Sequence, residues 1–221
     1  MQRKVIAELL DDDLGTPEEI AKSLVDLRHI NHWFGGTWTT ATLLRRIARE
    51  SGQTKLSLLE VGAGRGDLPQ QVRSSLALAE IDLKITLLDR IPSHLPQNTV
   101  PSVAADALHL PFQDDAFDVV SNCLFAHHFE PGSLPLLAKE ALRVARRAVL
   151  INDLIRSRLH LGMVYLGLPL FASRITWHDA PASVRRAYTI EEMRSLLADL
   201  PAKRLEITRH YFYRMGVLLW K

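Results

Sequence analysis

Glycine and acidic residues gather in one short stretch that could hold a ligand. The run LLEVGAGRGDL places Gly62, Gly64 and Gly66 between Glu60 and Asp67. Glycines at a turn let a ligand approach the backbone, and the start of a following helix offers free amide hydrogens. A dinucleotide-binding loop has glycine at its first, third and sixth positions, whereas the sixth position here is Asp67. The acidic neighbours disfavour a pyrophosphate and favour a ligand that carries an amino group.

Histidines are the candidates for proton transfer, because their pKa lies near neutral pH. His127 and His128 follow an apolar run, and if that segment is extended only one of them faces the site. His178 lies in a later stretch rich in aromatic residues, where Asp153 could orient it. No spacing of histidine, aspartate and glutamate indicates a metal site, so none is expected. Cys123 is expected to be a buried, unreactive thiol.

The elements that must position these residues follow from the hydrophobic pattern. Helices are expected at 17–30 and 37–49, and from residue 55 short apolar runs alternate with helical stretches. This alternation predicts an α/β fold with a parallel sheet covered on both faces. The runs KRLEITRH and YRMGVLLW predict a closing antiparallel pair. We expect a single domain over 1–221 with an N-terminal helical cap at 1–50.

Residues 156–188 interrupt the alternation with apolar, aromatic and arginine side chains. One interpretation is a helical pair packed on the sheet edge. The other is an inserted cover that forms an apolar pocket with a few polar groups. Four residues are expected to contact a substrate: Trp33 from the N-terminal part, and Tyr165, Trp177 and Arg185 from this insert.

Composition sets the remaining limits. Hydrophobic residues make up 47% and charged residues 24%, which excludes wholesale disorder. The single cysteine excludes a disulfide framework within the chain and fits a cytoplasmic location. No secretory signal or membrane span is expected. The net charge is +2, with the basic excess in the last third of the chain, and we interpret those residues mainly as solvated helix faces.

The run Glu60 to Gly66 resembles the first motif of class I S-adenosylmethionine-dependent methyltransferases. The resemblance covers residues 55–153 closely and is nearest to the ubiquinone and menaquinone branch. It departs from that branch at 145–147, where Ala-Arg-Arg replaces a Gly-Gly turn. It implies a Rossmann-like, mostly parallel seven-stranded sheet with an antiparallel C-terminal strand, S-adenosylmethionine as cofactor and S-adenosylhomocysteine as product.

The resemblance also assigns roles to residues. Asp89 matches the residue that hydrogen-bonds both ribose hydroxyls, and Asp106 matches the one that contacts the adenine amino group. His128 occupies the place of a histidine common in the branch. The residues expected to bind the cofactor are Glu60, Gly62, Ala63, Gly64, Gly66, Asp89, Arg90, Asp106, Ala107 and Asn122.

The leading functional hypothesis is methyl transfer to the oxygen or carbon of a small acceptor, such as a phenol or quinol. His178 is the preferred candidate base and His128 the second. Two alternatives remain open: a cofactor-binding module without turnover, and an RNA methyltransferase. The latter is disfavoured because Ser121 to Leu124 lack the Asn/Asp-Pro-Pro-aromatic motif of amino-group methylators. We expect no nucleic-acid partner.

Overall fold

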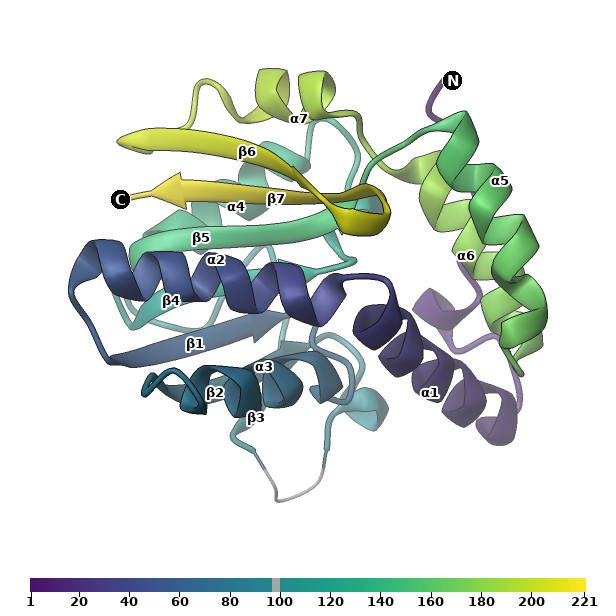
Figure 1. The fold of residues 1–221 in the computed structure, drawn as a ribbon, viewed down its shortest axis with the longest axis horizontal. Coiled ribbons are helices and arrows are strands. Elements are labelled where there is room, and N and C mark those ends of the chain that lie inside the picture. Colours follow the sequence, from purple (N-terminus) through teal and green to yellow (C-terminus); the bar gives the residue numbers. More distant parts are fainter. Residues whose placement is uncertain (97–99) are drawn as a thin grey trace.

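Seven strands form one sheet in the computed structural model, which describes residues 1–96 and 100–221 (Figure 1). The strands are β1 (Lys55–Val61), β2 (Asp82–Asp89), β3 (Ser102–Ala104), β4 (Phe117–Cys123), β5 (Ala145–Leu154), β6 (Arg204–His210) and β7 (Arg214–Trp220). Their order is β3-β2-β1-β4-β5-β7-β6, and β7 runs antiparallel to both of its neighbours. The expected α/β architecture, with a mostly parallel sheet and an antiparallel C-terminal strand, is confirmed.

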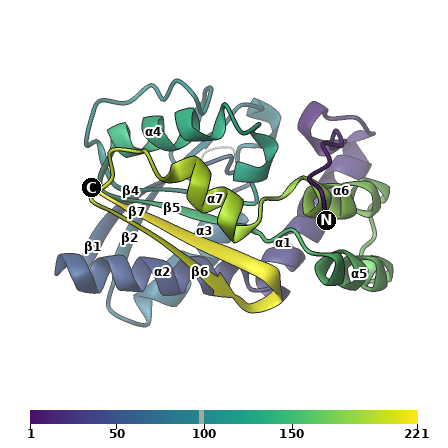
Figure 2. The same ribbon diagram turned by 90° about the horizontal axis from the view of Figure 1, so that it is seen from above.

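Helices cover both faces of the sheet and the carboxyl ends of its parallel strands. They are α1 (Pro17–Trp33), α2 (Gly36–Ser51), α3 (Asp67–Ala77), α4 (Leu134–Val144), α5 (Arg158–Gly167), α6 (Arg174–Arg186) and α7 (Ile190–Leu197). Figure 2 shows α2 and α3 on one face and α4 and α7 on the other. Because both faces are covered, the middle of a central strand is a continuous apolar run and does not alternate with polar residues. Val149, Leu150 and Ile151 of β5 are all fully buried.

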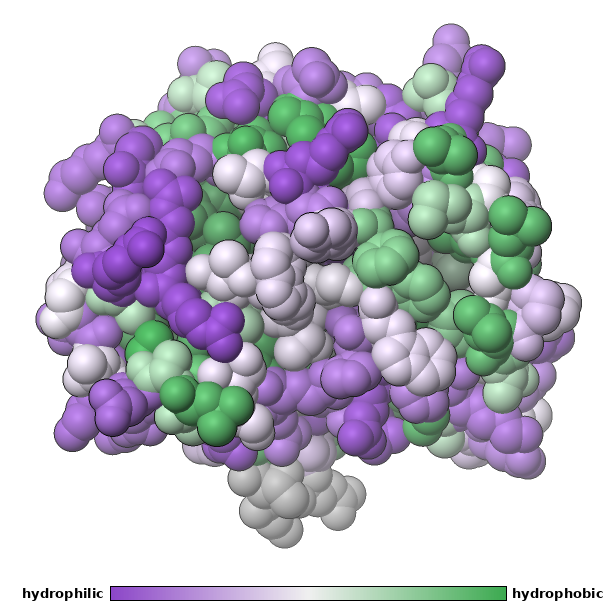
Figure 3. All heavy atoms as spheres, viewed as in Figure 1, coloured by the Kyte–Doolittle hydropathy of each residue, from purple (hydrophilic) through white to green (hydrophobic). Residues whose placement is uncertain are grey.

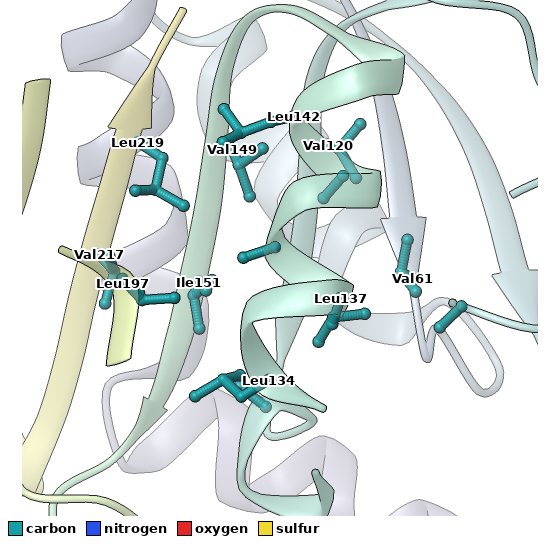
Figure 4. Close-up of a cluster of buried hydrophobic side chains, with 14 of the residues drawn as sticks. Val61, Val120, Leu134, Leu137, Leu142, Val149, Ile151, Leu197, Val217 and Leu219 are labelled. Carbon is teal, nitrogen blue, oxygen red and sulfur yellow. The ribbon is translucent and has the colours of Figure 1, made fainter. Parts of the chain in front are cut away.

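The core on the α4 side joins residues from several strands. Figure 4 shows Val61, Val120 and Val149 on β1, β4 and β5, close to Leu137 and Leu142 of α4. This packing fixes the strands relative to one another. The carboxyl ends of β1 and β4 are thereby held side by side, where ligands bind in open α/β sheets.

Helices α1, α5 and α6 lie beyond the carboxyl ends of the parallel strands (Figure 1). Each begins at a side-chain cap, on Thr16, Ser157 and Ser173 respectively. Residues 156–188 are therefore mostly a pair of helices. Residues 1–50, expected to form one N-terminal helical cap, lie in two different places. Helix α1 lies over the strand ends, whereas α2 packs on β5 and β7.

The first residues of the chain are attached to this helical pair. The Lys4 amide donates to the carbonyl of Arg185 at 3.0 Å, and Figure 2 shows the N-terminal stretch beside α6. A short 3₁₀ segment, η1 (Leu10–Asp12), follows. The amides of Leu9 and Leu10 donate to the Asp179 carboxylate at 2.8 and 3.0 Å. The N-terminal stretch therefore belongs to the wall beyond the strand ends.

Hydrophobic residues gather on the surface over α5 (Figure 3). Leu159, Met163, Leu166 and Leu170 are exposed there at spacings of three and four residues. Such spacing puts them along one side of the helix and of the turn that follows. None of the helices described is both long and apolar enough to cross a membrane.

Candidate functional site

The glycine loop after β1 combines close packing with an open position. Gly62, Gly64 and Gly66 all have positive φ angles, of +67°, +49° and +70°. A Cβ atom at Gly62 would lie 2.4 Å from the ring of Phe125, and one at Gly66 would lie 2.5 Å from Leu87. At Gly64 a Cβ atom would meet nothing within 4 Å. Two glycines therefore let the loop pack, and the third leaves its backbone open to a ligand.

Asp89 ties the end of β2 to this loop. One carboxylate oxygen accepts the Gly64 amide hydrogen at 2.8 Å, and the other accepts that of Ile91 at 3.0 Å. Each carboxylate oxygen has a second lone pair, so the group can still accept hydrogen bonds from a ligand. Its position beside Gly64 fits the predicted contact with ribose hydroxyls.

Asp106 lies on the same side of the site. Its carboxylate accepts the Leu108 amide at 2.9 Å, and this bond holds the pKa of Asp106 below its ordinary value. The side chain remains more than half exposed, and the neighbouring Ala107 is buried. Both residues line the same cavity as Asp89, in keeping with a place for the adenine end of the cofactor.

Glu60 is a buried carboxyl at the end of β1. Its residue is 2% exposed, and the Ser121 hydroxyl on the adjacent strand donates to it. Burial raises the pKa of Glu60 to about 7, although the hydrogen bond from Ser121 opposes the shift. Nearby, the side-chain oxygen of Asn122 is buried without a hydrogen-bond partner in the described structure. Glu60 borders the cavity and suits a cationic amino group.

One cavity of about 730 Å³ joins the predicted cofactor residues to the helical wall. All the residues predicted to bind the cofactor line it except Gly66, which packs beneath the loop, and Asn122. Its other wall is largely apolar and comes from α1, α5, α6 and the turn between α5 and α6. Residues of this wall include Leu27, Met163, Val164, Phe171 and Val184. The volume is in the range of small-molecule sites.

The structure places the four predicted substrate residues elsewhere. None of them is among the residues described as lining the cavity. Trp33, Tyr165 and Trp177 are each about half exposed, and Arg185 donates to the Tyr165 hydroxyl at 2.7 Å on the surface. They occupy the outward faces of α1, α5 and α6, whereas aliphatic side chains and Phe171 face inward. These four residues are therefore not part of the proposed acceptor site.

The two candidate bases also differ in position. His178 is 43% exposed at its side chain, lies outside the cavity lining and contacts the Asp179 carboxylate at 2.8 Å. His128 lines the cavity, and its Nδ1 atom lies 2.8 Å from the Asp11 carboxylate. Asp153, expected as a partner of His178, instead contacts His127. Of the two candidates, only His128 is placed to meet an acceptor.

His127 shares the wall with His128, which corrects the expectation that only one of them faces the site. The segment is a 3₁₀ turn, η3 (Ala126–His128), and not an extended strand, so both rings point to the same side. His127 is buried, and its Nδ1 lies 2.6 Å from Asp153. Burial alone would lower the pKa of His127, but Asp153 and Glu8 outweigh it and raise this pKa to about 10.

Arg214 is a site residue that sequence reasoning missed. It begins β7, is 1% exposed and lines the cavity. Its guanidinium donates to the carbonyl of Phe34 at 3.2 Å and to the side-chain oxygen of Asn31 at 3.0 Å. Within the part of the chain that the structure describes, no carboxylate pairs with it. A buried cation without an anionic partner is costly, so Arg214 is suited to an anionic group on a ligand.

Comparison with known proteins agrees with this geometry. The sequence model of the methyltransferase domain family matches residues 59–151. No curated protein matches the sequence. Among solved structures, the plantazolicin methyltransferase BpumL, in complex with a pentazolic desmethylPZN analogue and SAH, is similar with a TM-score of 0.71. The identity is 15%, and the match covers 97% of this chain and 95% of that one.

Two further structures have the same fold. Human N-acetylserotonin methyltransferase in complex with SAM matches with a TM-score of 0.60 and 14% identity over 88% of this chain. This chain spans only 53% of that enzyme's length. A SAM-dependent methyltransferase from Aquifex aeolicus matches with a TM-score of 0.55 and 14% identity, over 81% of this chain and 87% of that one.

Proposed function

Because this chain is an S-adenosylmethionine-dependent methyltransferase with the class I fold, we propose that it methylates a small, largely apolar acceptor. The acceptor class is one with an aromatic hydroxyl group or an activated ring carbon, as in a phenol or quinol. Methylation then takes place on oxygen or carbon. The acceptor would enter the part of the cavity that α1, α5 and α6 enclose.

The continuity of the cavity carries this proposal. The same hollow that reaches Gly64 and Asp89 extends to Phe171 and Val184 without an intervening wall. An acceptor held there would share one space with the cofactor, as direct transfer requires. The mainly apolar lining selects a hydrophobic body, and His128 supplies a polar contact beside it.

The chain's own contribution is orientation and exclusion of water. S-adenosylmethionine supplies a methyl group that is already activated by its sulfonium charge. Gly64 and Asp89 position one end of the ligand, and the apolar wall holds the acceptor in line. A phenolate loses its negative charge as the sulfonium loses its positive one, and apolar surroundings favour that mutual neutralisation over solvated ions.

The experiment is transfer of a labelled methyl group from S-adenosylmethionine to a panel of phenols, quinols and RNA. We expect label on a phenol or quinol, and loss of transfer in Asp89→Ala. Cofactor binding by calorimetry without transfer to any acceptor would support a binding module instead. Label on RNA alone would support the RNA methyltransferase.

The structure offers little to the RNA alternative. Several arginines of the basic C-terminal part form ion pairs within the chain, among them Arg143 with Glu140 and Arg156 with Glu192. Arg147 likewise contacts Asp118 at 3.0 Å. Paired arginines contribute less to binding of a phosphate backbone than free ones, because their charge is already compensated.

A further inference from the structure

Three potential metal ligands meet at one point of the cavity wall. Glu8 comes from the N-terminal stretch, and His127 and His128 come from η3. One ligand atom from each residue lies within 4.8 Å of the other two. All three residues line the cavity.

Two of these atoms are buried and lack a hydrogen-bond partner in the described structure. They are the Oε1 atom of Glu8 and the Nε2 atom of His127. Their residues are 7% and 1% exposed. The two atoms face each other at 3.5 Å as a long ion pair, without a close hydrogen bond. Buried polar atoms without a partner are rare and costly, which indicates that a third group belongs between them.

Carboxylates orient both imidazole rings from behind. The Nδ1 atom of His127 lies 2.6 Å from Asp153, and that of His128 lies 2.8 Å from Asp11. With each Nδ1 hydrogen directed at a carboxylate, Nε2 is the atom left to bind a metal ion, which at His127 would take the place of the proton directed at Glu8. This arrangement of carboxylate, histidine and open Nε2 is the usual support of a histidine metal ligand. Here it occurs twice, and both Nε2 atoms point towards Glu8.

The distances suit a small transition-metal ion. Ligand atoms about 2.1 Å from a tetrahedral metal lie about 3.4 Å apart. The Glu8 carboxylate oxygens lie 3.5 Å from Nε2 of His127 and 3.9 Å from Nε2 of His128. Two imidazoles and one carboxylate favour zinc or another divalent first-row metal over magnesium or calcium, which prefer oxygen ligands.

We propose that Glu8, His127 and His128 form a binding site for a divalent transition-metal ion in the wall of the cavity. Three protein ligands leave at least one coordination position for water or another small ligand. The site takes its carboxylate from the N-terminal stretch, so metal binding also fastens that stretch to η3. The proposal concerns metal binding itself and does not depend on methyl transfer.

The test is cobalt binding to the full-length chain, freed of any histidine tag and stripped with a chelator. Cobalt absorbs visible light when nitrogen and oxygen ligands bind it with low coordination number, so binding has its own readout. We expect about one ion per chain, and affinity at least tenfold weaker in Glu8→Gln and in His128→Gln. Zinc should displace the cobalt and remove the absorption. His32→Gln, which changes an exposed histidine of α1, is the matched control and should bind as the wild type does.

Circular dichroism must show that each variant is folded before its affinity is compared. Absence of saturable binding in the wild type would overturn the proposal. Equal affinity in the wild type and Glu8→Gln would also overturn it, and would leave His127 as an ion-paired histidine. S-adenosylmethionine binding, measured separately by calorimetry, keeps failure of the metal site distinct from failure of the proposed function.

Discussion

The carboxylate of Asp89 accepts the backbone hydrogen of Gly64 at 2.8 Å. This bond joins the end of β2 to the only glycine of the loop whose missing side chain leaves open space on the cavity side. Any ligand that lies over Gly64 is therefore also within reach of Asp89. We therefore expect these two residues to determine where the cofactor lies along the sheet edge.

We expect Asp89→Ala to weaken S-adenosylmethionine binding tenfold or more. Charge-assisted hydrogen bonds contribute about 1.5–3 kcal/mol each, and the variant would lose those to the ribose as well as the bond to Gly64. Calorimetric titration measures the loss. Asp82→Asn, at the exposed start of the same strand, is the control. Unchanged affinity in Asp89→Ala would contradict the assigned role.

Much of the cofactor side of the site could be predicted from the sequence. The strands are apolar runs of ordinary length, and a glycine-rich turn between a strand and a helix has few possible geometries. Asp89 and Asp106 follow strands, and the carboxyl ends of parallel strands meet at one edge. Local pattern therefore determined both the elements and the places of these acidic residues.

The helical wall on the acceptor side could not be predicted, because it depends on how the helices are oriented and on contacts between distant segments. Tyr165 and Trp177 were expected to contact the substrate because they are aromatic. A small rotation about the helix axis, however, decides whether a residue faces inward or outward. Glu8 lies in an acidic N-terminal stretch without a recognisable motif. Only the folded chain brings Glu8 beside His127, and only the antiparallel return of β7 brings Arg214 to the cavity.

The stability of the protein should depend on pH through Glu60. Its pKa is about 7 in the folded protein and about 4.5 when unfolded, so between these values the folded state binds more protons. The free energy of unfolding should therefore fall as pH rises from 4.5 to 7, and the penalty should be complete above pH 7. Its upper limit is about 3.5 kcal/mol, from about 1.4 kcal/mol for each of about 2.5 pKa units.

Replacement of Glu60 by glutamine tests this directly. Urea unfolding of the wild type and Glu60→Gln should show the variant gaining stability relative to the wild type between pH 5 and pH 8. The gain arises because glutamine keeps an acceptor for Ser121 and cannot ionise. A difference between the two proteins that stays constant with pH would show that Glu60 does not titrate in this range.

Arg214 is expected to bind the carboxylate of the cofactor's amino-acid part. Its guanidinium is buried and lies next to Cys123 at the end of β4, near the glycine loop. We expect Arg214→Met to weaken S-adenosylhomocysteine tenfold or more and to leave methylthioadenosine, which lacks the carboxylate, nearly unaffected. Competition binding with the two compounds measures the difference, and Arg214→Lys should lie between. Equal losses for both compounds would indicate a purely structural role, and a loss confined to the acceptor's KM would place Arg214 against the acceptor.

The last prediction concerns which face of the helical wall selects the acceptor. Phe171 lines the cavity and is 9% exposed, whereas Tyr165 on α5 is 47% exposed and points away from it. We expect Phe171→Ala to raise the KM for the acceptor five-fold or more, because loss of a buried aromatic contact costs at least about 1 kcal/mol. Cofactor affinity should change little, since Phe171 belongs to the helical wall and not to the glycine loop.

Tyr165→Ala is the matched control, because it removes an aromatic side chain from the same wall but from its outer face. Steady-state kinetics with an identified acceptor, together with calorimetry of the cofactor, separates the two effects. A larger effect of Tyr165→Ala than of Phe171→Ala would restore the outward aromatic residues as the acceptor contacts. Equal damage to acceptor KM and cofactor affinity in Phe171→Ala would mean that the wall only supports the fold. A selective rise in KM is the result that requires the acceptor to lie against the inner face.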